Sequence, residues 1–251
     1  MLAAQRREFL LDRLRRDRRL VAKDVAAELG VSEDSVRRDL REMAAAGLCQ
    51  RVYGGALPAS PAVADYDTRR GVEVESKVRV AAAAAALIGT GDTVILDGGT
   101  TALAVARALP ADLRATVVTH SPQVAAALAE HPSIEVYVLG GRLFRHSMVT
   151  CGAAAVEAAR VVNADLFLLG VTGVHPDLGL TTGDADEAAM KRALAQRAAD
   201  TYVMASTEKI GAASRFSVLP LTAVAGVITD APSQDETVRR LTAAGVPMLV
   251  A

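Results

Sequence analysis

The stretch "ELGVSEDSVRRDLREMAAAGL", residues 28–48, decides the fold of the first part of this chain. Gly30 is suited to end one helix, and Ser32 is suited to cap the start of the next. Two helical patterns precede it, over about residues 4–17 and 23–29. The segment that follows, "LCQRVYGGAL", predicts two short strands around a Gly-Gly turn. Helix, short turn, helix and then a hairpin is the layout of a winged helix-turn-helix domain, which has an α+β fold.

The third helix, over about residues 33–46, has two unlike faces. At about 100° per residue, Val36, Leu40 and Met43 form one narrow apolar stripe. The opposite face carries Asp34, Arg37, Arg38 and Arg41. Arginine can read guanine edges through two hydrogen bonds and can also bind phosphates, so this face fits a DNA-reading role. Asp39 lies about 60° from the stripe and is expected to orient a neighbouring arginine.

The composition changes near residue 57. "LPASPAVADYDT", residues 57–68, has two prolines and no strong periodicity, so we expect a linker over residues 58–74 between domains at 1–57 and 75–251. Apolar strand-like runs then recur at residues 93–97, 116–119, 134–140, 165–170, 201–205, 224–229 and 246–251. Alanine-rich helical stretches lie between most of them, at residues 76–88, 101–109, 121–130, 153–161, 185–199 and 233–243. This alternation predicts an α/β domain with a mostly parallel sheet.

Composition limits the function classes. Hydrophobic residues make up 51% of the chain and charged residues 23%, an ordinary globular balance. No run reaches the roughly 20 apolar residues of a membrane span, and no export signal is recognisable. The two cysteines, Cys49 and Cys151, suit a reducing cytosol, and no metal-ligand spacing occurs. Residues 1–57 carry 12 basic and 9 acidic side chains, so the first part is basic within a chain of net charge −1.

The segment "DGGTT", residues 97–101, follows a predicted strand and opens a predicted helix. Unpaired N–H groups and the helix dipole favour an anion there. The segment is neither GxxxxGK[ST] nor GxGxxG, which disfavours ATP and dinucleotides. Other polar groups follow neighbouring strands: "THS" (119–121), "LGG" (139–141), Glu187 with Lys191, and Lys209. Ligands in open α/β sheets bind beyond the carboxyl ends of the strands, so these groups are expected to share one site.

Residues 5–56 resemble the amino-terminal domain of the DeoR family of bacterial transcriptional regulators. The match rests on "VSEDSVRRDL" followed by "GL…RVYGGA". One departure is Tyr53, where the family most often has histidine. The resemblance implies DNA contacts from Lys23, Ser32, Ser35, Arg37, Arg38, Arg41 and Arg51, and Tyr53 at the wing tip is a further candidate.

Residues from about 77 to 230 resemble the effector domain of the same family, through "GDTVILDGGTT", "TVVTHS", "GLTTGDADEAAMKRAL" and "EKIG". That domain is related to sugar-phosphate isomerases, deaminases and acyl-CoA transferases, and the resemblance implies a phosphorylated sugar or related metabolite as ligand. It places phosphate at the GGTT loop and the lysines, and sugar hydroxyls at Asp97 and Glu187. The full set of expected effector-binding residues is Asp97, Gly98, Gly99, Thr100, Thr101, Thr119, His120, Ser121, Gly140, Gly141, Glu187, Lys191 and Lys209. Two departures, His120 for asparagine and Ser206 for aspartate, bear on which ligand is accepted.

The leading hypothesis is a ligand-responsive transcriptional regulator, a repressor of a sugar-metabolism operon, with no catalytic residue, cofactor or metal. Its expected partners are an operator duplex, the effector and further copies of itself, a dimer at least, since two reading heads must bridge two half-sites. It is expected in the cytoplasm, on the nucleoid when bound to DNA, and not in a membrane. An isomerase or deaminase with an accessory DNA-binding head is the alternative, with Glu187 as the base and Ser206 leaving the catalytic pair incomplete. A DNA-binding protein whose second domain only oligomerises is the third.

Overall fold

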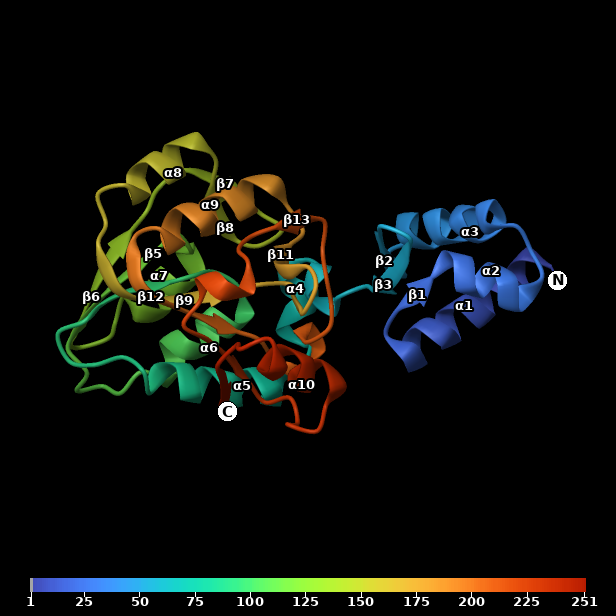
Figure 1. Cartoon of the computed structure of the whole chain (residues 1–251). Coiled ribbons are helices and arrows are strands. Elements are labelled where there is room, and N and C mark those ends of the chain that lie inside the picture. The colour runs from blue at the N-terminus through green and yellow to red at the C-terminus, as the bar shows by residue number, and fades with distance from the viewer. Residues whose placement is uncertain (1) are drawn as a thin grey trace.

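The computed structural model describes residues 2–251, which form a small amino-terminal unit and a larger carboxy-terminal unit (Figure 1). The small unit contains three helices and a three-stranded antiparallel sheet of order β1-β3-β2. Its elements are α1 (Ala3–Asp17), β1 (Leu20–Val21), α2 (Ala22–Leu29), α3 (Glu33–Ala45), β2 (Cys49–Val52) and β3 (Gly55–Pro58). The sequence-based prediction of a winged helix-turn-helix is confirmed, with helix ends within about one residue of those expected.

Local chemistry explains the turn of this motif. Gly30 ends α2 with a φ of 62°, a left-handed conformation that glycine adopts without strain. The Ser32 hydroxyl accepts a hydrogen bond from the Ser35 N–H at 3.2 Å and so caps α3. The apolar stripe of α3 is buried against α1 and α2, as its spacing predicts. Asp39 is buried as well and pairs with the Arg6 guanidinium of α1, so it orients an arginine of another helix.

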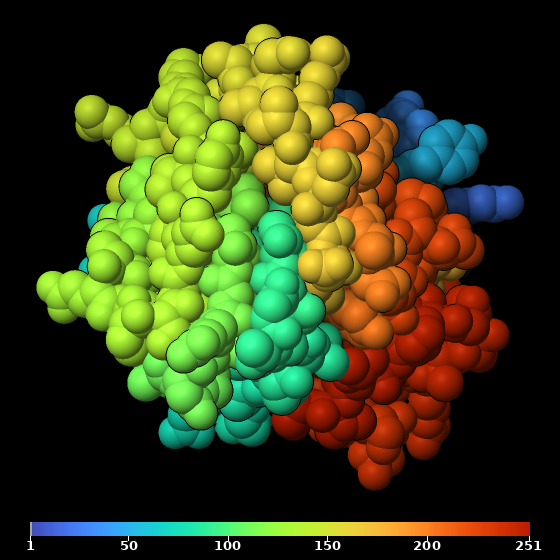
Figure 2. All heavy atoms as spheres, turned by 90° about the vertical axis from the view of Figure 1, so that its left-hand side faces the viewer, coloured from blue at the N-terminus to red at the C-terminus, as the bar shows by residue number. Residues whose placement is uncertain are grey.

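The large unit is built on a seven-stranded sheet of order β15-β14-β12-β9-β4-β5-β6, in which all neighbouring strands are parallel. Its strands are β4 (Thr93–Leu96), β5 (Ala115–Thr119), β6 (Ile134–Val138), β9 (Ala164–Gly170), β12 (Ala198–Met204), β14 (Gly226–Thr229) and β15 (Met248–Val250). The parallel α/β fold predicted from the alternating runs is therefore confirmed. Figure 2, seen from the end opposite the winged helix, shows the β6 side in green and the carboxy-terminal segment in red on opposite sides of the molecule.

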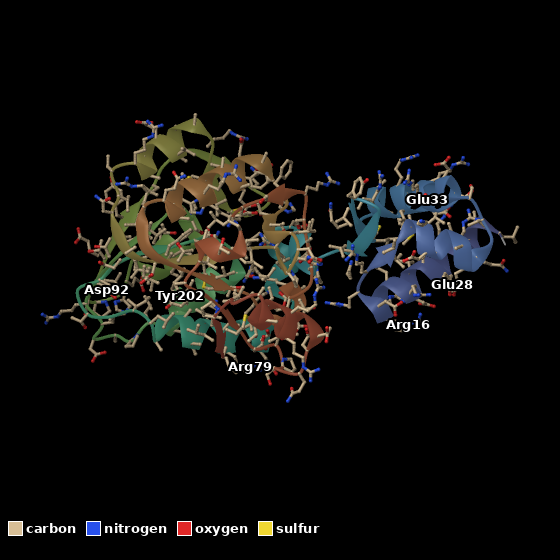
Figure 3. The ribbon with its side chains drawn as sticks, in the orientation of Figure 1. Arg16, Glu28, Glu33, Arg79, Asp92 and Tyr202 are labelled. Carbon is tan, nitrogen blue, oxygen red and sulfur yellow. The ribbon has the colours of Figure 1, made fainter. Side chains whose placement is uncertain are left out.

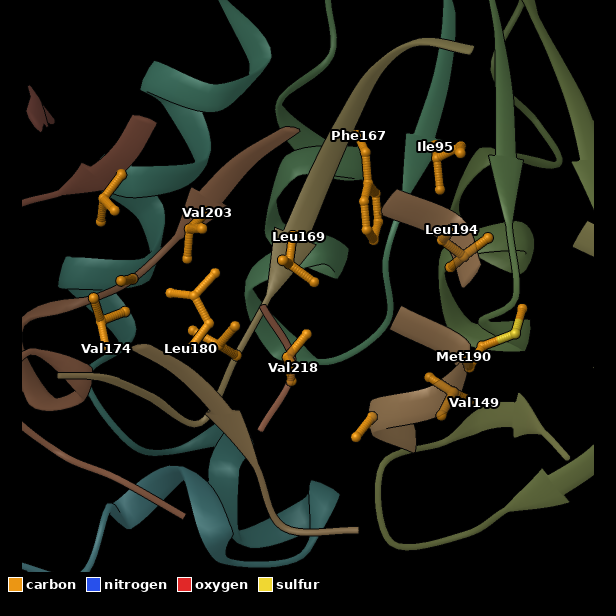
Figure 4. Packing of buried hydrophobic residues seen from close by; sticks show 14 of the residues in the cluster. Ile95, Val149, Phe167, Leu169, Val174, Leu180, Met190, Leu194, Val203 and Val218 are labelled. Carbon is orange, nitrogen blue, oxygen red and sulfur yellow. The ribbon is translucent and has the colours of Figure 1, made fainter. Parts of the chain in front are cut away.

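Helices cover both faces of this sheet. α5 (Val74–Ala85), α6 (Thr100–Ala108) and α7 (Pro122–Leu128) pack on one face, where Val94 and Leu96 point. α8 (Ala153–Ala159), α9 (Ala185–Ala195) and α10 (Glu236–Ala243) share the opposite core. Figure 4 shows Ile95 and Phe167, from that face of the sheet, close to Leu194 and Met190 of α9.

Short antiparallel elements lie outside the main sheet, and sequence reasoning did not foresee them. β7 (Arg142–Phe144) pairs with β8 (Val149–Cys151) as a hairpin. β10 (Gly173–His175), β11 (Gly179–Thr182) and β13 (Phe216–Ser217) form a second small sheet. Three 3₁₀ turns complete the chain: η1 (Pro61–Val63), η2 (Thr207–Lys209) and η3 (Leu221–Ala223).

The segment expected to be a linker without regular structure is folded, which corrects that expectation. It contains η1 and the helix α4 (Tyr66–Arg70), capped by Asp65 through the Thr68 N–H at 2.8 Å. Ser60, Ala62 and Tyr66 are buried in it. Prolines and small residues hid this order because η1 and α4, with three and five residues, are too short to show a repeating helical pattern. Within residues 2–251, none of the helices combines the length and the apolar character that crossing a bilayer requires.

Candidate DNA-reading face and strand-end cavity

The exposed face of α3 carries the arginines that the sequence singled out. Arg37, Arg38 and Arg41 are all exposed, and Arg37 donates to Glu33 at 2.6 Å. Within residues 2–251, no ion pair engages Arg38 or Arg41. Figure 3 shows Glu33, from α3, on one side of the small unit and Arg16, from α1, on the other.

Neighbouring elements extend this face. Lys23 at the start of α2 and Arg51 on the wing strand β2 are exposed. Tyr53, at the wing tip beside Gly54 with its φ of 76°, has a fully exposed ring. Ser32 and Ser35 share a hydrogen bond of 2.9 Å between their hydroxyls at the helix start. All eight predicted DNA contacts therefore lie on α2, α3, the turn between them or the wing.

The second candidate site lies where the direction of the sheet connections changes. From β4 the chain proceeds to β5 and β6, whereas from β9 it proceeds the other way to β12, β14 and β15. Adjacent strands β4 and β9 therefore leave a crevice at their carboxyl ends, the usual ligand position in such sheets. The segment 97–99 follows β4 there and leads directly into α6.

The amino terminus of α6 opens into a cavity. Gly99 precedes the helix with a φ of 96°, a conformation that favours glycine. The N–H groups of Gly99, Thr100 and Thr101 have no helical partner, because they lie at the first turn. The cavity is lined by Ala62, Arg69, Val72, Lys77, Gly98, Gly99, Thr100, Thr101, Ser147, Gly170, Val171, Thr172, Thr182, Glu187, Glu208, Lys191 and Lys209.

Asp97 forms the floor of this cavity and does not line it. The side chain is fully buried, and its Oδ2 atom accepts from Lys191 Nζ at 2.6 Å and from the Gly170 N–H at 2.8 Å. Its Oδ1 atom accepts from the Gly98 N–H at 2.8 Å and meets His120 Nε2 at 2.7 Å. Both carboxylate oxygens are already engaged, so the expectation that Asp97 contacts sugar hydroxyls is corrected. Asp97 instead supports Lys191 from beneath the cavity.

His120 completes the floor. Its Nδ1 atom lies 2.8 Å from the Thr150 carbonyl oxygen, and its Nε2 atom faces the Asp97 carboxylate. The ring is therefore held from both sides, by a main-chain carbonyl and by the buried carboxylate.

Opposite charges hold the floor together. Burial raises the pKa of Asp97, but the charge of Lys191 and the hydrogen bond from His120 outweigh it and hold that pKa below its usual range. Burial lowers the pKa of Lys191, but the charges of Asp97 and Glu187 outweigh it and keep that pKa above its usual value. Lys191 Nζ also lies 3.6 Å from Glu187 Oε1, a pair that is buried and not on the surface. The four side chains form one buried, connected group of ion pairs and hydrogen bonds.

Three further cations converge above this floor. Lys209 is buried, and its Nζ donates to Thr101 Oγ1 at 3.3 Å beside the start of α6. Burial lowers the pKa of Lys209 to about 8, and the nearby Lys77 and Arg69 charges add to this against the opposing charge of Glu208. Burial likewise lowers the pKa of Lys77 and of Arg69. Apart from His120, the cavity and floor hold four cations and three carboxylates, an excess of positive charge that suits an anionic ligand.

The structure thus divides the predicted effector-binding residues into three groups. Gly98, Gly99, Thr100, Thr101, Glu187, Lys191 and Lys209 line the cavity. Asp97, Thr119, His120 and Ser121 are fully buried, and Ser121 caps α7. Gly140 and Gly141 do not line it, because they form the turn into the β7–β8 hairpin.

Sequence reasoning missed six polar residues that line the cavity: Arg69, Lys77, Ser147, Thr172, Thr182 and Glu208. The N-cap pattern that begins at Asp65 signals a helix, but only the tertiary fold brings its arginine to the cavity. Glu208 also corrects one argument. Ser206 is buried and donates to Glu208 Oε1 at 2.7 Å, while the other oxygen of Glu208 is buried without a partner within residues 2–251. The cavity therefore keeps a carboxylate in spite of Ser206.

A winged helix joined to a strand-end cavity rich in cations defines a ligand-sensing DNA-binding protein. Residues 6–61 match the family described as the DeoR-like helix-turn-helix domain, and residues 72–231 match the DeoR C terminal sensor domain. The chain belongs to the DeoR family of transcriptional regulators.

Whole-length relatives agree with this assignment. The HTH-type transcriptional regulator GlpR of Haloferax volcanii is 31% identical, with 99% of this chain and 98% of that protein covered. The glycerol-3-phosphate regulon repressor of Escherichia coli is 28% identical, with 92% of each covered. Among solved structures, ribose 5-phosphate isomerase A from Methanocaldococcus jannaschii has a TM-score of 0.37 and 17% identity, covering 51% of this chain and 50% of that chain.

Proposed function

We propose that this regulator is a repressor whose operator binding is modulated by a phosphorylated sugar or related metabolite bound in the strand-end cavity. The observation that carries the proposal is the convergence of Lys209, Lys77 and Arg69 over the open amino terminus of α6. Buried cations without matching carboxylates are costly unless an anion completes the site. A relative named as a glycerol-3-phosphate regulon repressor is in keeping with a phosphorylated ligand.

The cavity suggests how such a ligand lies. Its phosphate is placed at the N–H groups of residues 99–101, beside Lys209 and Arg69. Its hydroxyls are placed toward Glu187, whose Oε2 atom accepts from Thr182 at 3.0 Å, and toward the unpartnered oxygen of Glu208. Asp97 and His120 hold Lys191 in place beneath it.

On the DNA side, we propose that Arg37, Arg38 and Arg41 enter the major groove, with Ser32 and Ser35 at the start of the reading helix. Lys23, Arg51 and Tyr53 lie where they would contact the backbone beside it. Because one reading head covers only one half-site, the acting form is at least a dimer.

We also propose that the ligand is sensed and not transformed. Glu187 and Glu208 both line the cavity, so carboxylates that could move protons are present. Glu187 is held by Thr182 and Lys191, which favours a fixed binding role. Isomerised product formed in proportion to protein concentration would favour the enzyme alternative.

A ligand panel tests the proposed function. Glycerol 3-phosphate, ribose 5-phosphate, glucose 6-phosphate, fructose 1-phosphate, fructose 6-phosphate and inorganic phosphate are each added in a thermal-shift assay. At 100 times its Kd, a true ligand stabilises the fold by about 2.7 kcal/mol, a clear rise in Tm. Lys209→Met is expected to lose the rise, whereas Arg114→Met, which removes an exposed cation away from the cavity, is expected to keep it. No shift with any compound would favour a domain that only oligomerises.

A further inference from the structure

Arg69 reaches the cavity from the segment that joins the two units. Its Nη2 atom donates to the His146 carbonyl at 3.3 Å, and its Nη1 atom lies over Gly99, 3.6 Å from where a Cβ would stand. Its Nε atom is buried and has no hydrogen-bond partner within residues 2–251. The guanidinium therefore presents unused donors beside the open amino terminus of α6.

The helix that carries Arg69 is fixed from inside the cavity. Lys77 Nζ donates to the Arg69 carbonyl at 2.6 Å and also to the Val72 carbonyl. Tyr66 of the same helix is buried, and its ring lies 5.9 Å from the Arg69 guanidinium carbon. The backbone and the tyrosine of α4 are thus tied to the cavity together with Arg69.

The same segment runs directly into the wing. Pro58 ends β3, the central strand of the winged-helix sheet, and Ala59 then pairs with Ala213 of the large unit. Ala62, in η1, lines the cavity. Only residues 59–68 separate the wing from the arginine in the cavity, and they contact the large unit along their length.

A second connection begins at Lys209. The next residue, Ile210, offers its carbonyl to Arg18 Nη2 at 3.3 Å. Arg18 is the residue that ends α1. Arg19 adds a looser ion pair with Asp177 at 3.8 Å. Two cavity cations, Arg69 and Lys209, are thus each a few residues from a contact with the reading head.

Resting on the proposed function, we propose that Arg69 is an effector-binding residue through which occupancy of the cavity changes the position of the winged helix. Without a bound anion, Arg69 lies near Lys209, Lys77 and the positive end of α6, and Glu187 and Glu208 offset this positive charge only in part. A phosphate between them reverses the sign of these interactions and draws Arg69 toward Gly99. The ligand would then bind more tightly when residues 58–72 are in one position than when they are in the other. Such a difference in affinity is what coupling between the two sites requires.

The test compares Arg69→Gln with Arg70→Gln. Arg70 is the next residue of the same helix, is exposed and does not line the cavity. Binding of the panel compound that most raises the wild-type Tm is measured by calorimetry. DNA affinity is measured by anisotropy with and without that compound at saturation, on a duplex that the wild-type protein selects from a random-sequence pool. Hydrogen exchange of residues 58–72 is followed in the same samples.

We expect Arg69→Gln to bind DNA as the wild type does without effector and to bind the compound about tenfold more weakly. At saturation, its DNA affinity is expected to change less than twofold, and exchange in residues 58–72 is expected to stay unchanged. Arg70→Gln should behave as the wild type, and Arg69→Lys should recover part of the response. An unchanged response of Arg69→Gln at saturation would overturn the coupling role alone. A wild type that binds none of the compounds would overturn the proposed function and the coupling role together.

Discussion

The two groups of cations in this protein differ both in burial and in residue type. On the winged helix, Arg38, Arg41 and Arg51 are exposed and spread over α3 and the wing. In the large unit, Lys77, Lys191 and Lys209 are almost completely buried around one cavity. Exposed cations suit a polyanion such as DNA. They replace the counterions on its phosphates, so the binding affinity falls as the salt concentration rises. Buried cations suit one small anion. Away from water, each cation interacts strongly with a nearby anion and is costly to leave unpaired.

The largest expected effect comes from the floor of the cavity. Lys191→Met leaves Asp97 and Glu187 buried without their cation, and removing one member of such a group costs about 3–5 kcal/mol of unfolding free energy. Denaturant unfolding measures it. Arg160→Met, which removes one member of the exposed pair with Glu157, should cost about 1 kcal/mol or less. Equal costs for the two variants would show that burial does not separate the two groups of cations.

The next effect belongs to the reading helix. Arg38→Ala should lose about 1–3 kcal/mol of binding free energy per half-site, enough to abolish operator binding by a dimer in a gel shift. Because Arg38 is exposed, the Tm should stay unchanged. Arg15→Ala on α1, on the other side of the unit, is the matched control. Operator affinity that survives the loss of Arg38 would remove α3 as the reader.

A pH series separates lysine in the cavity from arginine on the surface. Burial lowers the pKa of Lys209 to about 8, so the unliganded lysine loses its charge as pH rises through 8. Bound phosphate favours the charged form and raises that pKa, so effector affinity is full below pH 8 and falls above it, by up to about tenfold per pH unit. Arginine keeps its charge throughout, so DNA affinity without effector should stay level from pH 7 to 9. Lys209→Arg should flatten the effector curve, and a wild-type curve already flat would show that Lys209 does not touch the anion.

The smallest effect concerns the wing. If Arg51 contacts only phosphate, Arg51→Ala weakens all DNA sequences alike and reduces the salt slope of log affinity by about 1. Binding measured from low to moderate salt on selected and unrelated duplexes checks this. A loss confined to the selected duplex would instead make Arg51 a base reader.

Sequence patterns predicted the regular parts of this fold well. The Gly30 and Ser32 signals placed the turn of the reading motif, because caps depend on neighbours in the chain. The apolar runs placed each strand of the seven-stranded sheet, since burial on both faces demands them. Strand order depends on contacts between distant segments, which no local pattern encodes. The β7–β8 hairpin is local, but its strands of three residues each are too short to show an alternating pattern.

The cavity was only partly predictable for the same reason. Some residues of the cavity follow strands or lie in the first turns of helices: the "DGGTT" loop, Glu187, Lys191 and Lys209. Ligands of open α/β sheets bind beyond the carboxyl ends of the strands, so these residues could be predicted to lie together. Asp97 fits the same rule, yet its oxygens face Lys191 and His120 beneath the cavity. Arg69 comes from α4, in a segment whose composition is typical of a linker, and Lys77 comes from α5, so neither follows a strand of the sheet.

The main-chain pairing of Ala59 with Ala213 gives the joining segment a consequence for the operator itself. Coupling free energies are reciprocal. The factor by which the effector changes DNA affinity therefore equals the factor by which DNA changes effector affinity. Where the effector lowers DNA affinity, an operator-bound molecule holds the metabolite more weakly than a free one. The concentration at which the gene responds is therefore set jointly by the cavity and by the strength of the operator sequence, so one sensor can serve operators with different thresholds.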